Sequence, residues 1–324
     1  MSSDQKRTIF YHHPCLDGVT SAWAAYQAYG DAVQYVGLDH ADYKTIETTI
    51  LNHVTPDTIA TFIDFAPRQE ILKSVLDHVQ KVEVLDHHIT AEKDLAPYLN
   101  HEKCDIVFDM DRSGASIAYD TYVGHGKPRP LFIQLVENFD LYKPERFESL
   151  DQFYLIGSFF STIDVNRPFD KVRPEIDDLC KVDNIVEFER LGEAPRQDYR
   201  KKIDTVLDAA SLVNLNFLDN GQGLTQVPVS KGHIRDLGHE FSPLFLDTCP
   251  MPEKIGFLWS YHDEDTIKIS FRSDGNVDVS LIAEELGQNY GLNGGGHKGA
   301  ASVRFTIDQF EQFAAQSGVS FDKS

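Results

Sequence analysis

The side chains best suited to chemistry in this sequence are histidines and aspartates in separate short stretches. His12 and Asp17 lie in FYHHPCLDG, Asp64 in TFIDF, His87 in VLDHH and Asp140 in ENFDLY. Imidazole and carboxylate groups suit Mn²⁺, with Mg²⁺ or Zn²⁺ as alternatives. Two divalent ions about 3.5–4 Å apart, bridged by a carboxylate, can hold both the attacking and the leaving oxygen of a phosphoryl displacement. These residues predict a two-metal site, with Mn²⁺ as the expected ion and Mg²⁺ as the alternative.

The charge of the chain limits which phosphate compounds it can bind. Its 324 residues include 30 Lys and Arg against 51 Asp and Glu, a formal net charge of −21. Non-specific binding of long nucleic acids needs basic side chains that displace counterions. We therefore expect a small phosphate-bearing substrate and no long nucleic acid, with the substrate charge neutralised locally by metal ions.

The elements that must position these residues alternate between strands and helices in the first half of the chain. Such alternation predicts a parallel α/β sheet, whose ligands bind beyond the carboxyl ends of the strands. His12, Asp64 and the Asp86–His88 group all fall at expected strand ends, so they should meet at one edge. The expected strands are 8–11, 33–38, 58–65, 81–85 and 104–108, and the expected helices run from Asp17 to Gly30, from Pro67 to about Val79 and over 113–122.

A second, smaller α/β domain is expected after a charged helical segment at 185–215. The predicted organisation is an N-terminal domain over 1–185, a helical linker over 186–220 and a C-terminal domain over 221–324. The expected C-terminal elements are strands at 226–230, 254–260, 266–272 and 301–307, and a helix at 279–286 ahead of a glycine cluster.

The sequence gives no sign of a membrane span or of a disulfide framework. It has no apolar run of 18 or more residues, no apolar N-terminal stretch, and four cysteines without a C-x-x-C pair. We expect a soluble cytoplasmic protein that does not contact membranes. The oligomeric state stays open, with a homodimer as one alternative.

Five stretches in order over nearly the whole chain resemble the motifs of the DHH phosphoesterases. FYHHPCLDGVTSAW is similar to their first motif, TFIDF to the second, VLDHH to the signature third and ENFDLY to the fourth. GGGHKGAAS, residues 294–302, resembles the glycine-rich motif of the C-terminal domain associated with them. The resemblance implies a two-domain, metal-dependent phosphoesterase.

The resemblance also implies a role for each matching residue. His12 and Asp17 would hold different metals, Asp64 would bridge them, His87 would be a further ligand and Asp140 would complete one shell. The catalytic pair would be Asp86, which supports the histidines, and His88, which faces the scissile phosphate. The implied substrate-binding residues are Arg112, Ser113, Arg272, Gly294, Gly295, Gly296 and His297, with Lys298 a less secure addition.

Several alternatives stay open at this point. Cys15 occupies the place of the first aspartate in the family's H-x-x-x-D-x-D pattern, either as a ligand or as a small buried residue, and His13 is a possible substitute. This leaves the number of metals open. Asp109 and Asp111 are rival carboxylates to Asp140. Asp64 and Ser113 could act as helix caps, and residues 294–296 could form a plain loop.

The resemblance extends to proteins that cleave very short nucleotides. Similar two-domain proteins include nanoRNases and enzymes that act on cyclic dinucleotides or linear products such as pGpG. Hydrolysis of dinucleotides to mononucleotides is therefore the expected reaction. The alternatives are a phosphoanhydride hydrolase of the exopolyphosphatase or pyrophosphatase kind, and a nucleotide-binding sensor with little activity because of Cys15.

Overall fold

A computed structural model describes residues 6–39, 43–124, 126–233, 237, 240–292 and 294–321. The chain divides into two compact units, Met1–Gly192 and Glu193–Ser324. The division falls within the long helix α9 (Ile185–Asp208) and inside the segment expected as a linker. Within these described ranges, none of the helices combines the length and apolar character needed to cross a bilayer.

The first unit is built on a parallel sheet with the strand order β2-β1-β3-β4-β5. The central strand β3 is buried along its whole length, as expected for a sheet covered on both faces. This architecture confirms the predicted fold class. The strands are β1 (Arg7–His12), β2 (Gln34–Leu38), β3 (Ile59–Ile63), β4 (Lys81–Asp86) and β5 (Cys104–Phe108).

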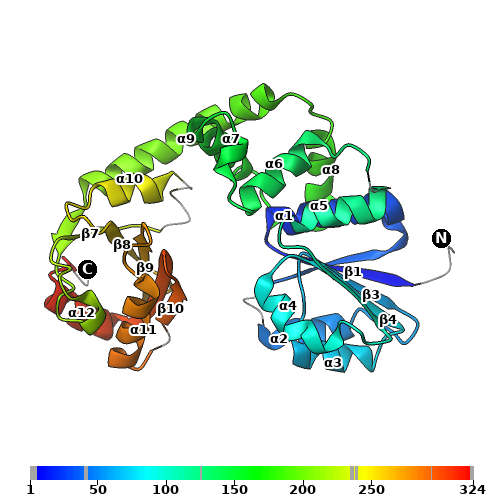
Figure 1. Ribbon diagram of the computed structural model, residues 1–324, viewed down its shortest axis with the longest axis horizontal. Helices are drawn as coiled ribbons and strands as arrows, with labels where there is room; N and C mark the ends of the chain where they lie inside the picture. Colours follow the sequence, from blue (N-terminus) through cyan, green and yellow to red (C-terminus); the bar gives the residue numbers. More distant parts are fainter. Residues whose placement is uncertain are drawn as a thin grey trace. The chain divides into compact units, whose positions relative to one another are not determined.

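Helices cover both faces of this sheet, because alternate strand side chains point to opposite sides. Ile9 and Tyr11 of β1 belong to one apolar core, whereas Phe10 between them belongs to the other. Helices α1 and α5 lie over the first face and α2, α3 and α4 over the second (Figure 1). The helices of this unit are α1 (Leu16–Tyr29), α2 (Tyr43–Leu51), α3 (Gln69–Leu76), α4 (Ile89–Leu95), α5 (Gly114–Tyr119), α6 (Leu131–Asp140), α7 (Leu150–Phe160) and α8 (Phe169–Leu179).

The second unit contains a six-stranded sheet with the order β10-β11-β9-β8-β7-β6. Only the β7–β8 pair is parallel; the other pairs are antiparallel. Phe257 of β8 packs in the core that α11 and α12 cover, and the next residue, Leu258, packs with α10. The elements are β6 (Ser211–Val213), β7 (Val227–Lys231), α10 (Phe241–Asp247), β8 (Ile255–Tyr261), β9 (Thr266–Ser273), α11 (Val279–Tyr290), β10 (Gly294–His297), β11 (Ala300–Thr306) and α12 (Ile307–Ser317).

Four expected segments differ from the structure. The helix after Pro67 begins only at Gln69, and the helix expected over 185–215 ends at Asp208, because the chain then enters strand β6. The strand expected over 58–65 ends at Ile63, since the next residue turns to a positive φ of 53°. The glycine cluster forms strand β10, because pairing with β11 supplies the backbone hydrogen bonds that a loop would lack.

Candidate metal centre

The predicted ligands converge at the carboxyl edge of the parallel sheet. His12 is the last residue of β1, Asp64 follows β3 directly, and Asp86 is the last residue of β4. Two further carboxylates reach the same edge from helices, Asp17 from the first turn of α1 and Asp140 from the end of α6. The sheet topology thus brings together residues that are distant in the sequence.

Asp64 occupies the centre of this group. Its Oδ2 atom lies 3.4 Å from His12 Nδ1, and its Oδ1 atom lies 3.1 Å from His87 Nε2. The side chain is only 2% exposed, and the backbone N–H donates to the Leu85 carbonyl oxygen at 2.9 Å. Its φ of 53° is uncommon outside glycine, although aspartate tolerates it better than most residues. The backbone is therefore held in a rare conformation that turns each carboxylate oxygen toward a different imidazole.

Three overlapping groups of possible ligand atoms lie at this edge. One comprises Asp64, Asp86, His87 and His88, and the other two form sets that are suited to two cations. In the second set, His87 Nε2 lies 3.8 Å from Asp17 Oδ2 and 3.5 Å from Asp140 Oδ2. Asp64 is close to both sets, as a bridging carboxylate must be. The candidate ligands of the first set are His12, Cys15 and Asp64 and those of the second are Asp17, His87 and Asp140, and within each set the ligand atoms all lie within 4.8 Å of one another.

The electrostatics of the centre favour bound positive charge. Burial, followed by the charges of Asp64 and Asp140, raises the pKa of Asp17 well above its usual range. Burial lowers the pKa of His87, but the hydrogen bond with Asp64 and the nearby carboxylates outweigh it and raise this pKa to about 9. The three carboxylates around His87 therefore stabilise a positive charge at this position, which a metal cation could supply in place of the proton. The donor set fits divalent ions such as Mn²⁺ or Mg²⁺.

The first residues of helix α5 fix the position of Asp17. The Asp17 carboxylate accepts hydrogen bonds from the backbone N–H groups of Gly114 at 2.6 Å and Ala115 at 3.0 Å. A negative charge is favourable at this end of a helix. A Cβ atom at Gly114 would lie 2.5 Å from Asp64 Cβ and 2.9 Å from Asp17 Oδ2, so only glycine fits. This role of Gly114 is not evident from the sequence alone, although a glycine at a helix start was a usable signal.

Asp86 orients the two histidines that follow it. Its Oδ1 atom accepts from the His87 backbone N–H at 2.7 Å and pairs with His88 Nδ1 at 2.7 Å. The bond with Asp86 raises the pKa of His88, and burial opposes the rise. The His88 side chain is 42% exposed, whereas Asp86 is buried. This arrangement leaves the Nε2 side of the His88 ring for a ligand.

Cys15 lies in the first ligand set, at the N-cap of α1. Burial, together with the charges of Asp64 and Asp17, raises the pKa of its thiol, so that binding a cation through sulfur would release a proton. The rivals His13, Asp109 and Asp111 belong to none of the ligand sets found among the described residues.

Arg112 and Ser113 border the centre but are engaged locally. The Arg112 guanidinium donates to Asp120 at 2.9 Å and to the Ser116 carbonyl oxygen, so it lies along α5. Ser113 caps α5 by accepting from the Ser116 N–H at 3.4 Å, and its own N–H donates to buried Glu137 at 3.4 Å. Glu137 was not anticipated, although it precedes Asp140 by about one helical turn.

The predicted substrate residues of the second unit lie on its strands. Gly294, Gly295, Gly296 and the exposed His297 form β10. Arg272 of β9 is partly buried, which lowers its pKa, and its guanidinium donates to the Phe271 carbonyl oxygen at 2.7 Å. Gly294 and Gly295 also line a pocket of 350 Å³ together with Ser302, Val303 and Arg304.

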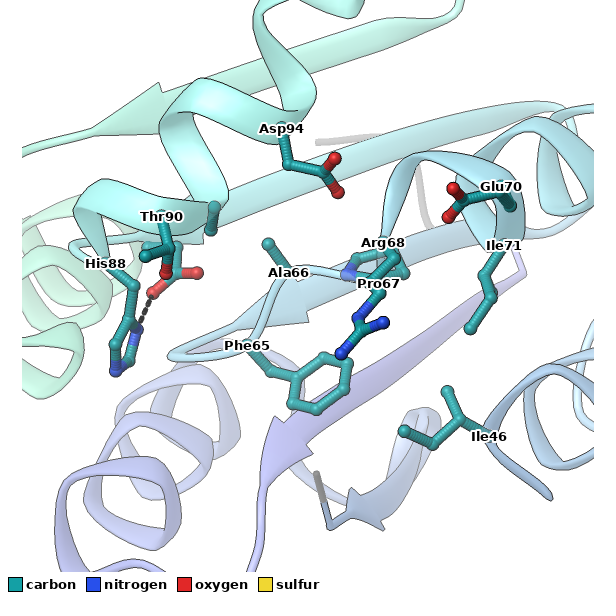
Figure 2. Close-up of a pocket in the computed structure, with 12 residues that line it drawn as sticks. Ile46, Phe65, Ala66, Pro67, Arg68, Glu70, Ile71, His88, Thr90 and Asp94 are labelled. Carbon is teal, nitrogen blue, oxygen red and sulfur yellow. Dashed lines mark hydrogen bonds and ion pairs between the residues drawn. The ribbon is translucent and has the colours of Figure 1, made fainter. Parts of the chain in front are cut away.

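A larger pocket of 510 Å³ lies directly beside the metal centre in the first unit. Asp86 and His88 belong to its wall, and Figure 2 shows the hydrogen bond between them at one side of the pocket. The rest of the wall comes from α2, from the segment after β3, and from α3 and α4. The other lining residues are Ile46, Phe65, Ala66, Pro67, Arg68, Glu70, Ile71, Thr90, Ala91 and Asp94.

Comparisons with known proteins agree with this architecture. Residues 245–317 match the DHHA1 domain family. An uncharacterized protein of Acanthamoeba polyphaga mimivirus is 25% identical over 319 residues, which cover 94% of this chain and 69% of that protein. Two solved structures share the fold, the DHH domain of a member of a family of ribosomal proteins and CDC45 from Entamoeba histolytica. The DHH domain aligns with a TM-score of 0.52 and 17% sequence identity, and the alignment covers 97% of this chain and 87% of that one. The CDC45 structure aligns with a TM-score of 0.51 and 10% sequence identity, and the alignment covers 96% of this chain and 94% of that one.

The DHHA1 match lies within the second unit, and the two solved structures share the two-unit α/β fold with this chain. The two ligand sets at the sheet edge are groups of side chains that could hold metal ions.

Proposed function

We propose that the protein is a Mn²⁺-dependent phosphodiesterase that hydrolyses linear dinucleotides such as pGpG to mononucleotides. The two-metal centre would comprise His12, Cys15 and Asp64 on one side and Asp17, His87 and Asp140 on the other. When bound, the divalent ions supply an activated water and neutralise phosphate charge.

The observation that carries the proposal is the position of Asp64. Its two oxygens lie 3.1 Å and 3.4 Å from two different imidazoles, within two ligand sets. A metal centre with one ion would not need a carboxylate turned toward both sets. The pair of sets therefore supports displacement at a phosphorus atom, where attacking and leaving oxygens both require stabilisation.

The protein's own side chains add positioning and proton transfer. His88, oriented by Asp86, would donate a hydrogen bond from Nε2 to the scissile phosphate. The hydrogen bond with Asp86 raises the His88 pKa and so favours the ring form that carries this proton. The net charge of −21 supports a short substrate, because a long polyanion would meet repulsion outside the centre.

A substrate panel tests the proposal. The purified chain is incubated with Mn²⁺ or Mg²⁺ and with pGpG, cyclic dinucleotides, polyphosphate or pyrophosphate, and the products are separated by chromatography. We expect mononucleotides from pGpG in Mn²⁺ and none after chelation. Asp64→Asn should abolish turnover, whereas the matched change at an exposed carboxylate, Asp183→Asn, should leave it unchanged.

Two results would reject the proposed reaction. Turnover of polyphosphate or pyrophosphate without turnover of dinucleotides would assign the chain to phosphoanhydride hydrolysis. Tight nucleotide binding without hydrolysis in either metal would assign it to the sensor class.

A further inference from the structure

The 510 Å³ pocket beside the metal centre has a composition that the phosphodiester chemistry does not require. We propose that it binds a nucleobase of the substrate and that Asp94 and Glu70 give it a preference for guanine. This inference rests on the proposed function and extends it to the part of the substrate next to the scissile phosphate.

The pocket lies where a group attached to the scissile phosphate would extend. His88 and Asp86 belong both to the candidate centre and to the pocket wall. The ring centroid of His12 lies 6.3 Å from that of His88 and 6.4 Å from that of Phe65, which is also in the wall. A phosphate that contacts these histidines therefore has the pocket within the reach of its own nucleoside.

One side of the pocket is apolar. Phe65, Ile46 and Ile71 line this side, and Ala66 and Pro67 continue the same wall. A flat aromatic base gains free energy by covering such a surface, whereas a chain of phosphates gains nothing from it. The volume also falls within the range of pockets for small ligands, about 300–1,000 Å³. The wall therefore favours a nucleotide over a polyphosphate.

The polar side of the pocket carries two carboxylates and a guanidinium. Figure 2 shows Asp94 of α4 and Glu70 of α3 pointing toward one another, with Arg68 extending toward Phe65. Asp94 Oδ2 accepts the Gln69 backbone N–H at 2.8 Å, which fixes the orientation of this carboxylate. Two carboxylates would repel a second phosphate but accept N–H groups of a base.

Guanine matches this set better than the other bases. Its N1–H and amino group form a donor edge that one carboxylate can accept, and O6 with N7 forms an acceptor edge suited to arginine. Uracil has a single N–H between two carbonyl groups, so a carboxylate placed for guanine would face a carbonyl oxygen. The pocket should therefore favour guanine over uracil.

The test compares the ratio of kcat/KM for pGpG to that for pUpU in the full chain with Mn²⁺. We expect the wild-type ratio to exceed one, and Asp94→Asn or Glu70→Gln to lower it by about tenfold. Asparagine at position 94 can still accept the Gln69 N–H, so the local fold is kept. Glu92→Gln, at an exposed carboxylate of the same helix outside the pocket, is the matched control and should keep the wild-type ratio.

A dinucleotide analogue whose sugars carry no bases, and which therefore has no aromatic ring, separates this inference from the function on which it rests. The wild-type protein and the Glu92→Gln control should hydrolyse it at equal rates, and the two pocket variants should lose less activity on it than on pGpG. Wild-type protein that cleaves no dinucleotide would reject the proposed function itself. Wild-type protein that cleaves dinucleotides with a guanine-to-uracil ratio of one or less, or with a ratio that neither variant changes, would overturn the pocket assignment alone.

Discussion

The backbone of Gly114 packs against Asp64 so closely that an added side-chain carbon would lie 2.5 Å from the Asp64 Cβ atom. The same residue donates its backbone N–H to Asp17 at 2.6 Å. One glycine thus controls the position of a carboxylate from each ligand set. Backbone packing at this helix start is part of the centre, although no Gly114 side chain can bind a ligand.

Gly114→Ala should disable the centre while the fold is kept. The methyl group must displace Asp64 or the start of α5, and a shift of about 1 Å in positioned groups costs roughly 100-fold in rate. We expect loss of most bound manganese and a comparable loss of turnover, measured by elemental analysis and initial rates. Gly232→Ala is the control, because a Cβ there has only ordinary contacts, the nearest at 3.4 Å. Full metal content in the Gly114 variant would contradict this account.

Asp86→Asn should reduce turnover through His88. Asp86 contacts His88 Nδ1 at 2.7 Å, and this bond raises the His88 pKa. Mutation of a residue that orients a metal-site histidine typically lowers activity or metal affinity by about 10- to 100-fold. Removing the charge should also lower the His88 pKa, so the alkaline limb of the pH–rate profile should move to lower pH.

The pH profile separates positioning from general damage to the fold. Asp109→Asn changes a carboxylate just beyond the neighbouring strand β5 that belongs to no ligand set, and its profile should match wild type. An Asp86→Asn variant with a wild-type rate and an unshifted profile would remove Asp86 from the site.

The sequence allowed prediction of those parts of the centre that depend on sheet topology. His12, Asp64 and Asp86 end or follow parallel strands, and parallel strands share one carboxyl edge. Their convergence therefore follows once the alternation of strands and helices is recognised. The fold class was predictable for the same reason.

The parts that depend on close packing were not predictable. Gly114 belongs to the centre because the absence of a side chain lets its backbone approach Asp17 and Asp64. Glu137 belongs to it because its side chain points from α6 toward the Ser113 backbone N–H. The pocket wall combines Ile46, Glu70 and Asp94 from three helices whose facing sides the sequence pattern does not define. Strand β10 was missed because glycine disfavours strands, and its pairing with β11 overrides that local preference.

Cys15 gives a spectroscopic test of the first ligand set. Its thiol lies with His12 and Asp64 in one group of possible ligand atoms. A thiolate prefers softer ions than a carboxylate does, so the Co²⁺-loaded protein should show a sulfur-to-metal charge-transfer band in the near ultraviolet. Cys15→Ser should lose this band, and Cys15→Asp should shift the retained metal from Zn²⁺ toward Mn²⁺ in a competition between the two.

The control for this test is another partly buried free cysteine. Cys180→Ser removes such a thiol from outside the ligand sets and should keep the band. A spectrum that is identical in wild type and Cys15→Ser would show that sulfur does not bind the ion and that Cys15 is only a buried residue.

The second unit contains a buried ion pair that should make its stability depend on acid. Arg196 donates to both oxygens of Glu240 at 3.1 Å, and Arg200 also pairs with Glu240. Burial by itself raises the Glu240 pKa, but the hydrogen bonds from the two arginines outweigh it and lower the pKa below its ordinary 4.5. A carboxylate with a depressed pKa contributes stability that is complete above its unfolded value and is lost as pH falls through the folded value.

Glu240→Gln should therefore destabilise the protein at neutral pH and matter less in acid. The change removes the negative charge that pairs with Arg196, which is 8% exposed, at a cost of about 3 kcal/mol. Urea unfolding followed by the fluorescence of Trp259 in a Trp23→Phe background measures the free energy of this unit. The difference from wild type should be constant above about pH 5 and shrink below it. Glu193→Gln, at an exposed carboxylate of the same helix α9, is the control, and a difference that stays the same down to about pH 3 would show that the ion pair does not set the acid response.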